Sequence, residues 1–409
     1  MTKFLKTASI IACMAALTPH ANAGTPDHYQ SDEELAMVDK KPQPGQLTAG
    51  DYDDILNPEL FKLYVDKMLQ GKLKGKNLPY VEAQNRVDIH VVDRNGEDFP
   101  LADISLKDSE GKEGLKLRTG ANGLSYIYPN LDELTPDHIL SVTVDAFETV
   151  DTNLDSEMIT EGGLIKVSLD AKRRPIEKLD LLLTFDATGS MGDEMRYLKA
   201  EFEAIVEEIS LRHPHIDMRH GLILYRDKGD EYVVKDFPFT DDLGRFQSTL
   251  NKQKARGGGD MPEAMHTALQ RGLTLDWRED SLKVNLLVAD APPHDNKIYE
   301  TWEAGLASRN LGIHLVPLAG SGVDKTAEFM MRNMATITKG RYLFLTDDSG
   351  IGNAHAEPTV DCYVVTHLDG LVTRVLDGLI TGERQEPNTD DIIRQVGNYQ
   401  AGRCLIDQQ

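Results

Sequence analysis

The segment Asp186–Met191 (DATGSM) places an oxygen-bearing side chain at every second position: Asp186, Thr188 and Ser190. Carboxylate and hydroxyl oxygens are hard ligands, which suit Mg²⁺ or Ca²⁺ and suit zinc poorly. A single motif of this kind often does no more than cap a helix through its Asp or Ser. A cation site therefore requires further acids from other parts of the chain.

Two later loops supply such acids. Residues 257–263 (GGGDMPE) contain Asp260, and residues 290–294 (DAPPH) begin with Asp290. Each acidic loop closes a predicted strand or leads into a predicted helix, so the three loops are expected at one edge of a sheet, where parallel sheets bind ligands. The predicted metal ligands are Asp186, Thr188, Ser190, Asp260 and Asp290. Mg²⁺ is the expected ion, with Ca²⁺ or Mn²⁺ as alternatives.

Other polar residues near these loops have simpler interpretations. His294 is expected to be a surface-loop histidine rather than part of a His–carboxylate site, because no matching Ser, Cys or second His accompanies it. Arg226 and Asp227 are expected to fix a hairpin loop. The three glycines of Gly257–Gly259 are not followed by Lys-Ser/Thr, which excludes a phosphate-binding loop of the usual kind.

The elements that must position these residues alternate between strand and helix from Leu179 onward. Residues 179–185 form a nearly continuous apolar run, as a central strand buried on both faces requires. An amphipathic helix follows, with apolar residues at steps of three and four from Met195 to Ile209. Further strands are predicted at 216–225, 232–237, 284–290, 313–318 and 341–344, and helices at 262–273, at 298–311 and in a segment that runs through 338. The predicted fold of residues 176–346 is a Rossmann-like α/β domain with a doubly wound, mostly parallel sheet of six strands.

Residues 87–170 show a different pattern, with apolar residues at every second position and turns about every ten residues. This pattern predicts a small β-sandwich, with a hairpin turn at Asp93–Gly96. A calcium loop there is less suitable, because the glycine is misplaced for the EF-hand pattern. The stretches VDIHVVDRNGEDFPLADISLKD and RTGANGLSYIYP resemble the transthyretin-like or carboxypeptidase-regulatory-like sandwich found in many exported bacterial proteins.

The three acidic loops together resemble a von Willebrand factor A domain with a metal-ion-dependent adhesion site. DATGSM corresponds to the family's D-x-S-x-S motif, with Thr188 in place of the first serine. LILYRDKGDEYVVKDFPFT and GGGDMPEA resemble the branch found in hemicentins and α-kinase-associated A domains. The resemblance implies that Asp186, Thr188 and Ser190 hold the cation directly or through water and that Asp290 approaches it through water.

The main departure from the family pattern is Asp260, which stands where the family supplies a threonine. Three carboxylates around one divalent ion would leave the site formally anionic. We therefore hypothesise a resident cation that depends less on an acidic group from a partner.

Composition excludes some functions. The 67 Asp and Glu residues exceed the 44 Lys and Arg residues, giving a net charge of −23, which opposes binding to a phosphate backbone. No nucleic acid partner is therefore expected. No segment after the N-terminal region approaches the length of apolar residues that spans a bilayer.

The N-terminal 23 residues have the order of a secretory signal peptide. Lys3 and Lys6 precede an apolar run over residues 7–17, and Ala21–Ala23 is a small-x-small cleavage site, so the mature chain is expected to begin at Gly24. An alternative lipoprotein box ends at Cys13, but it leaves only about six apolar residues against the ~7–15 usual for that region. The expected location is periplasmic or secreted.

Cleavage after Ala23 would leave two cysteines, Cys362 and Cys404. In an oxidising compartment such a pair predicts one disulfide, closing a loop of about 40 residues and contributing ~3–4 kcal/mol to stability. Two unpaired thiols would be the expectation in the cytosol.

The remaining segments connect these parts. Residues 24–50 are expected to be an acidic, exposed leader, residues 51–86 a helical segment, and residues 347–409 a C-terminal tail containing the disulfide. The whole predicts a non-enzymatic, exported protein that binds an unidentified protein ligand through the metal site. Two alternatives stay open: a metal-stabilised structural module of an envelope complex, and a metal-assisted hydrolase with His294 as base.

Overall fold

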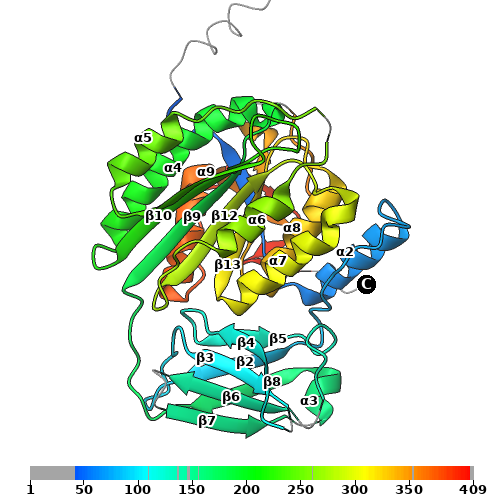
Figure 1. Ribbon diagram of the computed structural model, residues 1–409, viewed down its shortest axis with the longest axis vertical. Coiled ribbons are helices and arrows are strands. Elements are labelled where there is room, and N and C mark those ends of the chain that lie inside the picture. The colour runs from blue at the N-terminus through cyan, green and yellow to red at the C-terminus, as the bar shows by residue number, and fades with distance from the viewer. Residues whose placement is uncertain are drawn as a thin grey trace, which may run out of the picture. The chain divides into compact units, whose positions relative to one another are not determined.

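The computed structural model describes residues 42–108, 110–135, 138–144, 148–154, 156–259, 261–351 and 354–405. Most of these residues belong to an α/β body built on one large sheet, drawn in Figure 1. The sheet has the strand order β11-β10-β9-β12-β13-β14-β1-β15-β16. Its strands are β1 (Thr48–Tyr52), β9 (Lys178–Asp186), β10 (Asp217–Tyr225), β11 (Val234–Thr240), β12 (Leu282–Ala289), β13 (Ile313–Ala319), β14 (Tyr342–Thr346), β15 (Tyr363–His367) and β16 (Arg394–Val396).

The five neighbouring strands β10, β9, β12, β13 and β14 run parallel, and the outer strands pair antiparallel. This confirms the predicted mostly parallel α/β fold and all six predicted strands. The carboxyl ends of β9, β10 and β12 meet at one edge, since Tyr225 pairs with Asp186 and Val288 pairs with Phe185. The loops with the predicted ligands therefore leave the sheet side by side.

Helices cover both faces of the sheet. Alternate residues of β9 enter different cores, with Leu181 and Leu183 on one face and Leu182 on the other. The first face packs against α4 (Gly192–Arg212), α5 (Leu243–Asn251) and α9 (Leu368–Thr381). The second packs against α2 (Pro58–Gln70), α6 (Met265–Leu273), α7 (Ile298–Asn310) and α8 (Lys325–Ile337). This double cover explains the continuous apolar run in β9.

The sheet has nine strands rather than the predicted six. Residues 48–50, expected in an exposed leader, are buried in β1, which lies between β14 and β15. The region expected to be a C-terminal tail contributes β15, α9 and β16. These strands are short and lack a clear apolar alternation, so only their long-range pairing identifies them. Asp54, just after β1, forms a buried ion pair with Arg332 of α8 at 2.6 Å.

Residues between α2 and β9 form the predicted β-sandwich. One sheet has the order β5-β2-β8 and the other β4-β3-β6-β7, and their facing residues share one core. The predicted turn at Asp93–Gly96 is present, because the Gly96 amide donates to the Asp93 carbonyl at 3.0 Å. The elements are β2 (Val87–Val92), β3 (Asp103–Lys107), β4 (Glu113–Arg118), β5 (Leu124–Ile127), β6 (Ile139–Val144), β7 (Glu148–Asn153), α3 (Ser156–Glu161) and β8 (Gly163–Ser168).

Cys362 and Cys404 form the predicted disulfide, with their Cα atoms 5.5 Å apart. The bond joins the start of β15 to a two-stranded hairpin, β17 (Tyr399–Gln400) and β18 (Arg403–Cys404). Asn57 holds the same hairpin, since it accepts a hydrogen bond from the Cys404 amide and donates one to the Gly402 carbonyl, both at 2.8 Å. The C-terminal hairpin is thus fastened to the segment before α2.

In the described part of the chain, no helix combines the length and the apolar character needed to cross a bilayer. The predicted signal peptide, its cleavage site at Ala23 and Gly24, and Cys13 lie outside the described residues.

Candidate metal site at the carboxyl edge of the sheet

The DATGSM segment forms a tight turn between β9 and α4. Asp186 is the last residue of β9, and the Thr188 amide and hydroxyl both donate to its Oδ1, at 3.0 and 2.7 Å. The Thr188 hydroxyl also lies 3.2 Å from the hydroxyl of Ser190. The three predicted ligands of this segment are therefore close together. Because both Thr188 donors reach the same oxygen, the other carboxylate oxygen, Asp186 Oδ2, is left for another group.

The glycine-rich loop packs directly on this turn. The Gly189 amide donates to the Gly257 carbonyl at 2.9 Å. A Cβ on Gly258 would lie 3.0 Å from Glu263 Oε1 and 3.1 Å from Thr188 Cβ, so Gly258 separates these two residues by little more than its own backbone. Asp260, the ligand predicted from this loop, lies outside the described residues. The described acid that this loop brings to the site is Glu263.

The third loop contributes Asp290, the residue after β12. It is joined to the second loop, because the Glu263 amide donates to the Pro292 carbonyl at 2.9 Å and Glu263 forms a bridge with Pro293. The Ser190 hydroxyl favours the ionised form of Asp290, although burial raises the pKa of this carboxyl overall. The three predicted loops therefore meet at one point, as expected from the strand order.

Three buried carboxylates at this point each retain an oxygen that lacks a hydrogen-bond partner among the described residues: Asp186 Oδ2, Glu263 Oε2 and Asp290 Oδ1. The residues are 0, 2 and 7% exposed. Burial, together with the charge of Asp290, raises the pKa of Asp186 to about 7. Burial and neighbouring acids, Asp186 first among them, raise the pKa of Glu263 to about 9. The protein itself supplies too little positive charge here for these groups to ionise easily.

The donor set fits a hard divalent cation, since it offers carboxylate and hydroxyl oxygens only. Among the described residues, no three Asp, Glu, His or Cys side chains form a group that could hold a metal ion. An ion bound here would therefore also need the hydroxyls of Thr188 and Ser190. These residues together are the ones that would hold it.

Tyr225 and Glu263 are the site residues that the sequence interpretation missed. The Tyr225 hydroxyl is buried, and burial followed by the charges of Asp186, Asp290 and Glu263 raises its pKa well above the ordinary value. Its position at the end of β10, in register with Asp186, was the available signal. Glu263 was placed in the acidic loop 257–263 but was not named as a ligand, and a helix was also predicted from Pro262; α6 begins at Met265, so the acid belongs to the loop.

His294 differs from an isolated surface-loop histidine, because its Nε2 lies 2.7 Å from Asp227 Oδ1. Arg226 is buried and donates to the carbonyls of Ala187 and Lys254, both at 3.1 Å. His294 and Arg226 thus hold the loops of the site together.

Part of the chain is similar to known proteins. Residues 180–351 match the family model described as von Willebrand factor A domain. An α-protein kinase, vwkA, from Dictyostelium discoideum is 29% identical over 136 residues, which cover 33% of this chain and 22% of that protein. A putative ariadne-like RING finger protein, R811, from Acanthamoeba polyphaga mimivirus is 30% identical over 190 residues, covering 41% of this chain and 18% of that protein. The chain thus spans about a fifth of the length of these curated relatives.

Solved structures give weaker similarities. BatB from Bacteroides thetaiotaomicron is 12% identical with a TM-score of 0.35, covering 49% of this chain and 98% of that one. Proximal thread matrix protein 1 from the mussel byssus is 12% identical with a TM-score of 0.34, covering 50% and 46%. The assignment therefore rests on the family match and on the sheet that carries it. Domains of this family generally take part in protein–protein interactions, and residues 180–351 of this chain are similar to a von Willebrand factor A domain.

Proposed function

We propose that this chain is an exported protein-binding protein whose A domain contacts its partner protein at a divalent cation. The proposed ligands are Asp186, Thr188, Ser190 and Asp290, with Glu263 added and Asp260 retained from the sequence. Mg²⁺ suits this oxygen set best, and Ca²⁺ or Mn²⁺ are possible substitutes. When bound, the ion would supply a fixed positive charge and a coordination position for an oxygen of the partner.

One observation carries the proposal: three buried carboxylate oxygens of Asp186, Glu263 and Asp290 without hydrogen-bond partners among the described residues. A buried carboxylate without a partner is costly, and the usual remedies are protonation, a counter-ion or a metal. A divalent cation held with the help of the Thr188 and Ser190 hydroxyls would offset the charge of these carboxylates, directly or through bound water.

Export is supported by two independent features. The N-terminal 23 residues have the charge, apolar run and cleavage site of a signal peptide, with Cys13 lipidation as the alternative. The disulfide between Cys362 and Cys404 suits the periplasm or an extracellular space, because disulfides rarely persist in a reducing cytosol.

Isothermal titration of Mg²⁺ into the metal-free chain tests the cation site. We expect one site in the wild type and its loss in Asp186→Asn, which keeps the shape of the side chain and removes the charge. Asp217→Asn, at the opposite end of β10, is the matched control and should bind Mg²⁺ as the wild type does. Absence of binding of Mg²⁺, Ca²⁺ and Mn²⁺ by the wild type would refute the proposal.

A purely structural metal is the second candidate, favoured by the deep burial of Asp186, Glu263 and Asp290. The melting temperature separates the two functions. A structural ion should raise it by many degrees on Mg²⁺ addition, and Asp186→Ala should lower it strongly. An ion used for recognition should leave the melting temperature of Asp186→Ala near that of the metal-free wild type, with loss of Mg²⁺-dependent partner binding.

A further inference from the structure

The segment Tyr225–Asp230, which begins at the last residue of β10, contacts all three loops of the candidate site. Its Arg226 is buried, and the guanidinium stacks over the Tyr232 ring at 4.3 Å. Arg226 Nε donates to the Ala187 carbonyl and Nη2 to the Lys254 carbonyl, both at 3.1 Å. Ala187 lies between the proposed ligands Asp186 and Thr188, and Lys254 leads into the glycine-rich loop. One side chain therefore joins the first loop to the second.

The other residues of the segment extend these connections. Asp227 Oδ1 lies 2.7 Å from His294 Nε2 in the third loop. The Asp230 carboxylate accepts hydrogen bonds from the Gly258 amide, at 3.0 Å to Oδ2. The Arg226 carbonyl also accepts a hydrogen bond from the amide of Ala264, next to Glu263. Each loop with a proposed ligand is thus held by at least one hydrogen bond from this segment.

We propose that the segment Tyr225–Asp230 sets the geometry of the cation site and that Arg226 is its main positioning residue. The inference rests on the proposed function, because it assigns these residues a role toward the same ion. The planar guanidinium has donors fixed in a fork, so it bonds two carbonyls from different loops at once. A lysine keeps the charge but offers one flexible ammonium, which does not hold both carbonyls in place.

The experiment compares Arg226→Lys with the wild type in the full chain, by isothermal titration of Mg²⁺ and, separately, of Ca²⁺. Residues behind the ligands typically control metal affinity by about 10–100-fold, and we expect a loss of that size for Mg²⁺. The loss for Ca²⁺ should be smaller. Mg²⁺ demands a near-ideal octahedron, whereas Ca²⁺ accepts irregular geometry. A shift in preference toward Ca²⁺ is the signature of displaced ligands, which general destabilisation does not produce.

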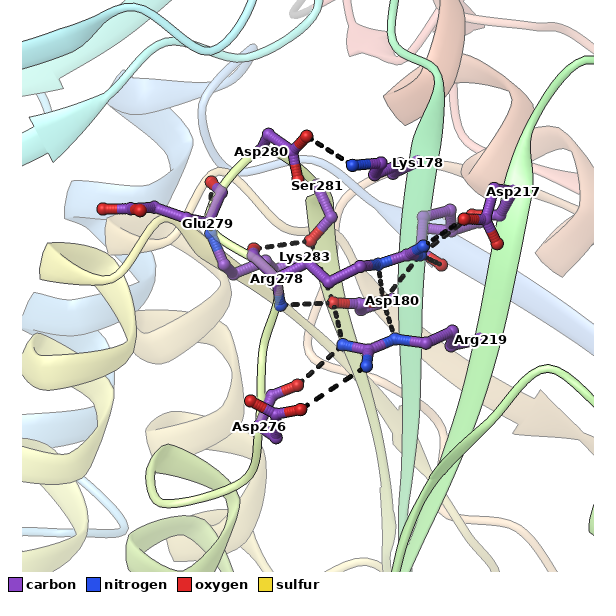
Figure 2. Close-up of polar contacts among 11 residues, drawn as sticks. Lys178, Asp180, Asp217, Arg219, Asp276, Arg278, Glu279, Asp280, Ser281 and Lys283 are labelled. Atoms are coloured by element: carbon purple, nitrogen blue, oxygen red, sulfur yellow. Dashed lines mark hydrogen bonds and ion pairs between the residues drawn. The ribbon is translucent and has the colours of Figure 1, made fainter.

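Arg219→Lys is the matched control, because Arg219 lies in β10, the strand that leads to Arg226, and also holds several groups at once. Figure 2 shows Arg219 and Arg278 converging on the carboxylate of Asp180. Arg219 Nε and Nη2 each lie 2.9 Å from an Asp180 oxygen, and Nη2 donates to the Asp276 carbonyl at 2.6 Å. This cluster lies where β9 and β10 begin, at the opposite end from Asp186 and Tyr225. Arg219→Lys should lower the melting temperature and leave the affinities for both ions unchanged.

The outcomes distinguish the cation site itself from the positioning role of Arg226. If the wild type binds no divalent ion, the proposed function fails. The positioning role is wrong if the wild type binds Mg²⁺ and Arg226→Lys binds Mg²⁺ and Ca²⁺ as tightly as the wild type does. It is also wrong if Arg219→Lys weakens Mg²⁺ binding as much as Arg226→Lys does. Should Arg226→Lys not fold, Asp230→Ala takes its place; it removes the hydrogen bonds that the Asp230 carboxylate accepts from the amides of Gly258 and Asp227. It should weaken Mg²⁺ binding more than Ca²⁺ binding, and unchanged binding would overturn the inference.

Discussion

Gly258 offers a direct perturbation of the site, because its backbone lies between Thr188 and Glu263. Replacement by alanine has two separate effects. The φ of +71° is left-handed, which costs an alanine about 1–2 kcal/mol of folding stability. The added Cβ would also lie 3.0 Å from Glu263 Oε1 and 3.1 Å from Thr188 Cβ. Both neighbours must then move by a few tenths of an ångström, since contacts this short are tighter than ordinary packing.

The two effects are separated by Gly111→Ala in the sandwich. Gly111 has a φ of +79°, and a Cβ there would meet nothing within 4 Å. Both variants should therefore lose about 1–2 kcal/mol in urea unfolding of the metal-free protein. Only Gly258→Ala should bind Mg²⁺ more weakly. Sites need their ligands within about 0.5 Å of the productive geometry, so we expect about a tenfold loss, or ~1.4 kcal/mol of binding free energy.

Isothermal titration at constant pH provides the measurement, with urea unfolding in EDTA as its companion. Equal Mg²⁺ affinity for Gly258→Ala and the wild type would refute the reasoning, because it would mean that the glycine-rich loop does not shape the cation site. Equal weakening by Gly111→Ala would refute it as well, since binding would then follow overall stability.

Three further predictions concern single groups. Glu263→Gln should weaken Mg²⁺ binding at least about tenfold, because it removes an anionic oxygen. It should also raise the melting temperature of the metal-free protein at pH 7, because the buried carboxyl of the wild type has to hold a proton there. Isothermal titration of Mg²⁺ checks the first effect, and melting in EDTA checks the second. Cys362→Ser with Cys404→Ser, a pair 42 residues apart, should lower the free energy of unfolding by about 4 kcal/mol, measured by urea titration. Burial lowers the pKa of His220 to about 4 in the folded protein. Between pH 6.5 and 4 the unfolded chain therefore binds more protons than the folded chain, and stability falls as the pH is lowered. His220→Leu should therefore reduce the loss of unfolding free energy between pH 7 and 5 by about 2 kcal/mol, and an unchanged slope would show that His220 is not the titrating group.

The local part of the site could be predicted from the sequence. Asp186, Thr188 and Ser190 are adjacent in a short motif, and the strand before them has an unmistakable apolar run. Asp290 follows another such strand. Because parallel strands present their carboxyl ends at one edge, two loops distant in sequence were expected to meet, and they do.

The missed features depend on long-range pairing. Tyr225 joins the site only because β10 lies in register beside β9. Strand β1 has the sequence TAGDY, which has no alternation of its own and becomes a strand by pairing with β14 and β15. Glu263 was placed in the acidic loop but not among the ligands, since Pro262 also predicts a helix start, although α6 begins only at Met265. Residue patterns report local preference, and these three features are fixed by distant neighbours.

The central claim is that a divalent cation binds between the three loops at the carboxyl edge of the sheet. The most direct test is an anomalous difference map from crystals of the full chain grown with Mn²⁺, collected at the manganese absorption edge. The account predicts one strong peak in contact with the side chains of Ser190, Asp186 and Asp290, directly or through one water. A map with no peak there, or with its main peak at another cluster of acids, would contradict the claim.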